Sequence, residues 1–478
     1  MSTEANPATR AGARRARRTG RSRRRFGKTF AITLAALVVV GVAGGAVSLG
    51  QGPRASSVAV DTEAVAAASG QRIVFTANQP LATVAPEQVS LSPDAPHTVV
   101  TSGRHVAVQF TYPLDPDTEY TVTIAGVSGA AGGPRADLAH AFHTGSPPIR
   151  ILQRRDGDDA IFTSNLAGDE AVPIFSARQI EDFRATRDGL VVATTDDEGN
   201  AALTAVDTET GETEPLALPG VGTVSQLQVA DHGGLVGYTF TDAAIGTTGS
   251  LDTALFLASL DDPAAEPQHI EVGEDPRVQE WAFVPQTSAL LVLAFDGQLR
   301  MIDTEKPDAD PVPLGGAIGI AGIEQGTGRA IIERLEDTIV IDLTTLEEFP
   351  LVEPDGFAAL GEPGPIAPAA EGATLRRYTQ LGDDGYPASQ SVVHVDSGGA
   401  VTPILDLADV GDVVLQVCAS PSGRYAAVLV APDLVDNPYD RYLRPLPQKL
   451  ETHIVDVRDG APVSVLQGSD ISWCARSS

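Results

Sequence analysis

Cysteine is scarce in this chain of 478 residues, which contains only Cys418 and Cys474. Two cysteines are too few for a disulfide-rich small domain and do not suggest a metal site. An even count in a chain that carries an export signal, described below, favours one disulfide between them. Two buried free thiols are the alternative.

Basic residues are scarce outside the amino terminus. The chain has 33 lysines and arginines against 63 aspartates and glutamates, which gives a formal net charge of -30. The first 28 residues hold nine arginines and Lys28 against one acid, Glu4, so the remainder has a net charge of -30 - 9 = -39. Such a body offers no basic field to replace the counterions of nucleic acids or anionic lipids. We therefore expect no nucleic-acid partner.

The common catalytic signatures are missing from the sequence. It contains no Gly-x-Ser-x-Gly elbow, no His-Glu-x-x-His helix and no phosphate-binding glycine loop. The eight histidines are scattered, and the two closest, His140 and His143, lie three residues apart in an expected strand, where they face opposite sides. We expect no metal site, no cofactor and no catalytic residues, so the chain is predicted not to be an enzyme.

One long uncharged run, residues 29–53, follows the basic amino terminus. About 20 apolar residues cross a ~30 Å hydrocarbon core as one helix, and basic flanks stay on the cytoplasmic side. The sequence therefore predicts a cytoplasmic tail at 1–28, a transmembrane helix at 29–53 in contact with the lipid bilayer, and extracytoplasmic domains after it. This topology predicts a single-pass protein of the cell membrane.

Two alternatives remain open at this end. Residues 22–28, Ser-Arg-Arg-Arg-Phe-Gly-Lys, resemble the twin-arginine export signal, although Gly27 stands where leucine is usual. That resemblance implies export of a folded protein, whereas the other interpretation is an ordinary arginine-rich flank. The small residues Ala46, Val47 and Ser48 suit a signal peptidase, and cleavage there would give a secreted protein.

Residues 54–71 are mostly small and predict a linker that holds the first folded unit off the membrane. Short alternating segments begin at Arg72, separated by Pro, Gly and Asp, which is typical of an antiparallel β-sandwich. The clearest segments are IVFTANQPL at 73–81, PLDPDTEYTVTIAGV at 113–127 and FHTGSPP at 142–148. Over residues 72–145 they resemble the bacterial Ig-like domain of surface-layer proteins. The resemblance implies an Ig-like spacer or adhesion module at 72–146.

From residue 147 the pattern becomes a repeat, in which a hydrophobic strand ends in Asp or Asn, followed by a polar turn and another strand. Successive repeats are 39 to 60 residues apart, about one four-stranded blade each. Seven such units predict an all-β, seven-bladed propeller over 147–478. The repeated positions are Asn165, Asp207, Asp261, Asp303, Asp342, Asp396 and Asp456.

The first unit lacks a leading strand, because Ile149 begins directly with the second kind of segment. Residues 470–475 copy the missing pattern at the other end of the chain. A strand donated by the carboxyl terminus would close the ring and remove its open edges. In this alignment Cys418 and Cys474 occupy the same register in neighbouring blades, so a disulfide between them would lock the closure.

The segment CASPSGRYAAVLV at 418–430 resembles the Ser-Pro-Asp-Gly turn of WD-repeat-like and TolB-like propellers, with Ser422 where aspartate is usual. The resemblance is architectural and implies a binding platform.

Three long loops, at about 241–252, 379–391 and 431–450, fall between the expected second and third strands of their blades, so they should emerge on one face. The last carries the densest aromatic and cationic patch of the chain. Tyrosine and arginine are favoured interface anchors, and loops on rigid scaffolds commonly carry function. The predicted binding residues are Tyr439, Arg441, Tyr442 and Arg444, and the alternative is an insertion that packs on its own blade.

Together these features predict a membrane-anchored binding or scaffold protein of the bacterial envelope, whose propeller presents a loop-rich face to a protein or glycan outside the membrane. The alternative is a hydrolase or lyase of a cell-wall polymer that uses the propeller channel. An enzyme should bring carboxylates, or a His-Tyr-Arg set, together at the channel mouth with shifted pKa values. A binding protein should expose a patch built from the long loops.

Overall fold

The computed structural model describes residues 34, 52–187, 189–231, 234–408 and 411–474. The predicted tail at 1–28 and nearly all of the predicted transmembrane helix at 29–53 therefore lie outside the described residues. Within the described ranges, no helix has the length and apolar character needed to span a membrane.

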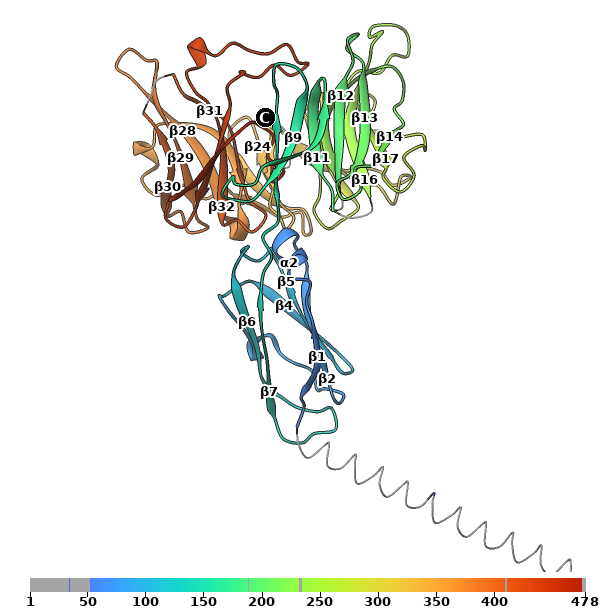
Figure 1. Ribbon diagram of the computed structural model, residues 1–478, viewed down its shortest axis with the longest axis vertical. Helices are drawn as coiled ribbons and strands as arrows, with labels where there is room; N and C mark the ends of the chain where they lie inside the picture. Colours follow the sequence, from blue (N-terminus) through green and yellow to red (C-terminus); the bar gives the residue numbers. More distant parts are fainter. Residues whose placement is uncertain (1–33, 35–51, 188, 232–233, 409–410, 475–478) are drawn as a thin grey trace, which may run out of the picture.

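The first folded unit is a β-sandwich of two antiparallel sheets (Figure 1). One sheet has the order β1-β2-β5-β4 and the other β3-β6-β7. Alternate residues such as Phe75, Val122 and Phe142 point between the sheets into one shared core, as period-two patterning requires. The elements are β1 (Ala55–Ala59), α2 (Ala64–Ala67), β2 (Arg72–Ala77), η1 (Pro86–Gln88), β3 (Val89–Ser92), β4 (His97–Ser102), β5 (His105–Phe110), β6 (Glu119–Val127) and β7 (Ala136–His143).

The expected linker at 54–71 is instead part of this sandwich. Strand β1 pairs with β2, with Ala55 opposite Ala77, and α2 buries Val65 and Ala66. The prediction of a linker was wrong because it rested on the small side chains of the segment. An edge strand is held by backbone hydrogen bonds to its neighbour, and these need no large side chains.

From Ile149 on, the described residues form seven consecutive antiparallel sheets, six of four strands and one of three. Because each sheet uses adjacent segments in order, the arrangement is the seven-bladed propeller that the repeat predicted. The blades are β8 (Ile149–Gln153), β9 (Asp159–Ser164), β10 (Val172–Ala177); β11 (Ile180–Ala185), β12 (Gly189–Thr195), β13 (Ala201–Asp207), β14 (Thr213–Leu216); β15 (Gly222–Val229), β16 (Leu235–Asp242), β17 (Ala254–Ser259), β18 (Gln268–His269); β19 (Val278–Phe283), β20 (Ala289–Ala294), β21 (Gln298–Asp303), β22 (Val312–Gly316); β23 (Gly319–Ile323), β24 (Arg329–Glu333), β25 (Thr338–Asp342), β26 (Glu348–Pro350); β27 (Glu362–Pro368), β28 (Thr374–Leu381), β29 (Pro387–Val395), β30 (Val401–Leu407); and β31 (Val413–Ala419), β32 (Tyr425–Ala431), β33 (Glu451–Asp456), β34 (Pro462–Gln467). Short 3-10 turns lie in the connections at η2 (Phe357–Ala359), η3 (Ala370–Gly372) and η4 (Leu434–Asp436).

The repeated aspartates form the turns between the third and fourth strands. The Asp207 carboxylate accepts hydrogen bonds from the backbone N–H groups of Glu209 and Thr210, and Asp342 does the same for the two corresponding residues of its own blade. These backbone bonds hold the pKa of Asp207 below its usual range. The repeat is therefore a turn signal, consistent with the preference of aspartate for such positions.

Polar side chains join neighbouring blades, in addition to the apolar cores between blades. Each bond runs from a side chain of one blade to the backbone of the next, so six successive blade junctions have a polar link. The bonds are Asp159 to Ile180 N at 2.8 Å, Arg184 to Leu227 O at 2.8 Å, Gln228 to Trp281 O at 2.6 Å, Glu280 to Ile320 N at 2.7 Å, Glu324 to Gly372 N at 2.7 Å and Arg377 to Val414 O at 2.8 Å.

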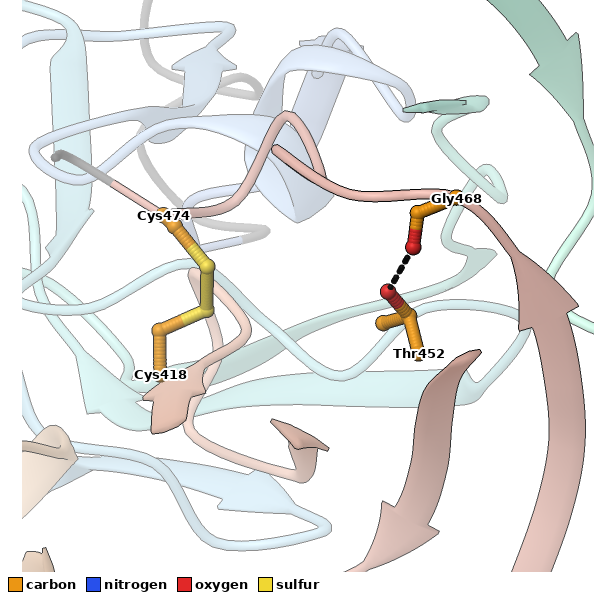
Figure 2. Close-up of a disulfide and its surroundings, with 4 residues drawn as sticks. All are labelled: Cys418, Thr452, Gly468 and Cys474. Atoms are coloured by element: carbon orange, nitrogen blue, oxygen red, sulfur yellow. Dashed lines mark hydrogen bonds between the residues drawn. A yellow bond between two sulfur atoms is a disulfide. The ribbon is translucent and has the colours of Figure 1, made fainter. Parts of the chain in front are cut away.

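The last junction, between the seventh blade and the first, is closed by the carboxyl-terminal segment. Leu152 and Ser469 exchange two backbone hydrogen bonds of 2.9 Å, and Ser472 bonds to Arg150, so this segment lies antiparallel to β8 as the inner ribbon of the first blade. Cys418 of β31 and Cys474 form a disulfide with a Cα–Cα distance of 5.6 Å (Figure 2). The disulfide predicted from register is therefore present.

The sandwich docks on one face of the propeller, at turns between the first and second strands of the blades and, in the seventh blade, also at the turn between the third and fourth strands. Three contacts, one from the connection after α2 and two from the connection between β5 and β6, reach the fourth, fifth and seventh blades. They are Ser69 to Gln286 at 2.6 Å, Tyr112 to Glu324 at 2.8 Å, and Asp115 with both Arg424 and Arg458. Glu324 is only 4% exposed, so this junction is a packed interface.

Candidate functional site

The candidate site is the propeller face opposite the sandwich, which we call the distal face. In consecutive antiparallel strands, turns between the first and second strands lie at one end of the blade, and turns between the second and third at the other. The sandwich occupies the first end, so the second end points away from it. Figure 1 shows this arrangement, with the sandwich below the propeller.

All three long loops belong to the distal face. They connect β16 to β17, β28 to β29, and β32 to β33, each a pair of second and third strands. The connections from one blade to the next emerge on the same face. The loop between β8 and β9, residues 154–158, joins them, because the carboxyl-terminal ribbon makes β8 the second strand of its blade.

The predicted binding patch divides into an exposed part and an anchored part. Tyr439 is 53% exposed, and Arg441 is exposed beside it. Tyr442 and Arg444 are half-buried. The loop therefore presents Tyr439 and Arg441 to solvent, and uses Tyr442 to hold its own position.

Tyr442 is anchored on the first blade, not on the blade that carries it. Its hydroxyl donates a 2.7 Å hydrogen bond to Asp159, a residue with no exposed surface. The Arg154 guanidinium lies 4.0 Å above the centre of the Tyr442 ring, in cation–π geometry. Burial and the Asp159 carboxylate both raise the pKa of Tyr442, so the phenol stays protonated and acts as a donor.

The rest of this loop is fixed to the first and second blades. Arg154 forms a 2.8 Å ion pair with Asp440, in which both side chains are about 10% exposed, and it also donates to the Arg444 carbonyl. The Leu443 N–H donates to Glu181 of β11 at 3.1 Å. The loop from the seventh blade thus spans the ring closure on the distal face, while the disulfide lies toward the opposite end of the inner strands.

Carboxylates do gather here, and they are hydrogen-bonded within the chain. Burial raises the pKa of Asp159, and donors from Ile180, Tyr442 and Arg155 oppose that shift. Both oxygens of Asp159 accept bonds from within the chain. One oxygen of Glu181 accepts from Leu443 and Gln179. These hydrogen bonds fix the loop. Neither carboxylate oxygen of Asp159 is left without a donor from within the chain.

The distal face also exposes apolar side chains that sequence reasoning did not single out. Most large apolar residues exposed on the described part of the propeller lie in its distal connections or at the distal end of a strand: Val221, Ile245, Phe295, Ile318, Leu335, Val352, Phe357, Leu381, Tyr386, Val435, Tyr439 and Leu443. The others lie on outer strands or in one turn of the opposite face: Val172, Val312, Leu346, Phe349, Val463 and Val465. Isolated apolar residues are normal on a surface, and the order of the strands places most of these on one face.

No family model and no curated protein matches this chain. Solved structures with a similar arrangement include dihydro-heme d1 dehydrogenase NirN in complex with DHE, at 15% identity and a TM-score of 0.40 over 68% of this chain and 74% of that one. The Myceliophteria thermophila Cps50 (Swd1) β-propeller domain is 14% identical, with a TM-score of 0.39 over 67% and 90%. TolB from Acinetobacter baumannii is 12% identical, with a TM-score of 0.36 over 66% and 62%.

These likenesses are too weak to bear on function. The sheet topology itself establishes that the chain is an all-β protein with a two-sheet sandwich followed by a seven-bladed propeller.

Proposed function

We propose that this protein is a membrane-anchored, extracytoplasmic binding or scaffold protein of the bacterial envelope, and that its distal face binds a protein or glycan outside the membrane. The observation that carries the proposal is the placement of the sandwich. It covers the propeller face opposite the long loops, so the loop-rich, apolar face is left free.

The order of the elements gives that face a direction. The chain runs from residue 52 through β1 to α2, and Ser69, just after α2, contacts the propeller. Strand β1 therefore starts at the far end of the sandwich. If residues 29–53 anchor the protein, the sandwich acts as an Ig-like spacer between bilayer and propeller, and the distal face points away from the membrane.

Photo-crosslinking from defined positions tests the proposal. In the full chain, expressed in its native membrane, a photoreactive amino acid replaces Tyr439 on the distal face, Val172 on an outer strand, or Val100 on the sandwich. All three side chains are more than half exposed, so each can reach a partner. We expect a discrete covalent adduct from position 439 and none from positions 172 and 100. Equal adducts from all three positions would mean that the distal face is not the recognition surface.

A loss-of-binding variant complements this experiment. The double variant Tyr439→Ala/Arg441→Ala removes exposed groups and keeps Tyr442, which anchors the loop. We expect it to lower the yield of the adduct formed from another distal position, Tyr386, by at least about tenfold. The matched control, Val463→Ala/Val465→Ala, alters an outer strand and should leave that yield unchanged.

The alternative, a hydrolase or lyase of a cell-wall polymer, has one observation in its favour, the gathering of Asp159 and Glu181 beside Asp440 of the loop at 431–450. Because these groups bond to other residues of the chain, we interpret them as supports that fix the loop and not as a reactive centre. Turnover of purified cell-wall polymer that is abolished by Glu181→Gln, with folding unchanged, would replace the binding proposal with this one.

A further inference from the structure

We infer that the third, fourth and fifth blades carry a docking surface for a protein that presents lysine or arginine together with apolar side chains. This inference rests on the proposed function, because it names the class of partner for part of the distal face. We call the surface the blade 3–5 sector, and define it by Val221, Ile245, Phe295, Ile318 and Leu335. It lies apart from the loop at 431–450, which spans the seventh, first and second blades.

The five apolar side chains belong to adjoining loops. The Val221 carbonyl accepts a backbone hydrogen bond from Ala243, in the loop that contains Ile245. That loop ends at Thr253, whose carbonyl accepts from Val278 at the start of the fourth blade. The sector is therefore continuous from the connection before the third blade to the edge of the fourth.

The same kind of contact continues into the fifth blade. The Phe295 N–H donates to the Arg277 carbonyl, and Ala317, next to Ile318, donates to Gly297. The Ile318 N–H donates to Glu333, two residues before Leu335. Exposed fractions in the sector run from 50% for Phe295 to 86% for Leu335, so burial of these side chains by a partner would remove substantial apolar surface from water.

The charged side chains of the sector indicate which charge a complementary partner would carry. Its basic side chains are already paired within the chain: Arg277 with Asp275 at 2.7 Å, Arg300 with Asp296 at 2.5 Å, and Arg334 with Glu348 at 2.5 Å. The Arg277 pair holds the pKa of Asp275 at about 2, so that acid stays ionised.

The blade 3–5 sector also carries exposed acidic side chains. Glu274, Glu336 and Asp337 are exposed and form no ion pair with another described residue. A partner with basic groups beside apolar ones matches this surface, because opposite potentials steer association and like charges oppose it.

The same features disfavour other occupants. A second copy of this chain would bring together two bodies of net charge about -39, from the composition given above. A glycan would find mostly aliphatic side chains, and the Arg277 guanidinium occupies one face of the one aromatic ring, Phe295, at 5.0 Å from the ring centre. The basic residues 1–28 would be on the other side of the membrane in the expected topology.

Defined peptide probes test the inference on the full chain in detergent micelles. We use a fluorescent peptide of alternating leucine and lysine, a peptide with serine in place of each leucine, and one with glutamate in place of each lysine. Anisotropy titrations should show that the leucine–lysine peptide binds at least about tenfold more tightly than either of the others. Equal affinity of the serine–lysine peptide would reduce the interaction to charge alone and overturn the inference.

Variants and hydrogen exchange then locate the site. Ile318→Ser/Leu335→Ser should weaken binding of the leucine–lysine peptide at least about tenfold, and the outer-strand control Val172→Ser/Val463→Ser should not. Protection from exchange should fall on residues 217–221, 243–253, 295–297 and 334–337. Protection of 431–450 instead would overturn the blade 3–5 sector and leave the distal face as the recognition surface. Protection on the sandwich or the outer strands would overturn both proposals.

Discussion

The phenol of Tyr442, in a loop of the last blade, donates a 2.7 Å hydrogen bond to the buried carboxylate of Asp159, in the first blade. The two residues are 283 positions apart in sequence, and their contact crosses the junction where the ring closes. The loop at 431–450 is therefore part of the distal face and also stabilises the junction between the seventh and first blades.

Removal of the Tyr442 hydroxyl should weaken the junction between the seventh and first blades. We expect Tyr442→Phe to lower the free energy of unfolding by about 1–2 kcal/mol, since Asp159 loses one donor and keeps two backbone donors. Because the phenol stabilises the ionised carboxylate, the difference between variant and wild type should shrink as pH falls through the pKa of Asp159. Burial raises that pKa above its usual value near 4.

Urea unfolding at several pH values measures this difference. The matched control is Tyr439→Phe, on an exposed ring of the same loop, which should change stability by less than about 0.5 kcal/mol. Equal effects of the two substitutions at every pH would contradict a stabilising role for Tyr442.

Reduction of the disulfide should weaken the junction between the seventh and first blades at the end that faces the sandwich. The 56-residue separation of Cys418 and Cys474 gives a chain-entropy contribution of about 4 kcal/mol, and measured values are commonly about 2–4 kcal/mol. We expect Cys418→Ser/Cys474→Ser to lower the free energy of unfolding by about 2–4 kcal/mol. Added reductant should lower the melting temperature of the wild type but not of the double variant, and a wild-type protein indifferent to reductant would refute the locking role.

The junction between sandwich and propeller should depend on Asp115. This residue is 9% exposed and receives the guanidinium groups of both Arg424 and Arg458. We expect Asp115→Asn to loosen the junction, because Arg458 would lose its anionic partner and Arg424 would keep only Asp456 of its own blade. Small-angle scattering of the full chain in micelles should show a larger spread of overall dimensions than for the wild type. Asp117→Asn, which alters an exposed pair with His143, serves as the control and should leave the dimensions unchanged.

Two glycines differ in what a methyl group would meet. A Cβ at Gly237 would lie 2.2 Å from the ring of the fully buried Trp281, whereas one at Gly316 would have its nearest neighbour at 3.7 Å. We expect Gly237→Ala to cost about 2–3 kcal/mol of stability and to alter the fluorescence of Trp281. Gly316→Ala should stay within about 0.5 kcal/mol, and similar losses for both would contradict the close packing at Trp281.

The architecture was predictable where local chemistry repeats. Turns such as the one at Asp207 need an acceptor for two backbone N–H groups, so aspartate recurs at blade spacing and the repeat can be counted. The disulfide was predictable because Cys418 and Cys474 hold the same place in that repeat. The Ig-like identity of the sandwich stays a prediction, since no comparison shows it.

The features that sequence reasoning missed depend on distant partners. Strand β1 forms because β2 offers a free edge, and nothing in the small residues of 55–59 signals that pairing. The division of the patch into exposed Tyr439 and anchored Tyr442 depends on Asp159 and Arg154 of another blade. The exposed residues of the blade 3–5 sector share a face only through the order of strands, so their spacing in sequence carries no signal.

The inner ribbon of the first blade comes from residues 469–474, more than 300 positions after the strand that it covers. During synthesis, β8 therefore keeps an unpaired edge until the final segment emerges, and the first blade is completed last. A chain that stops before Ser469 would retain that open edge, which is a template for pairing with other molecules. Residues 469–474 thus determine when the free edge of β8 is closed to pairing with other molecules.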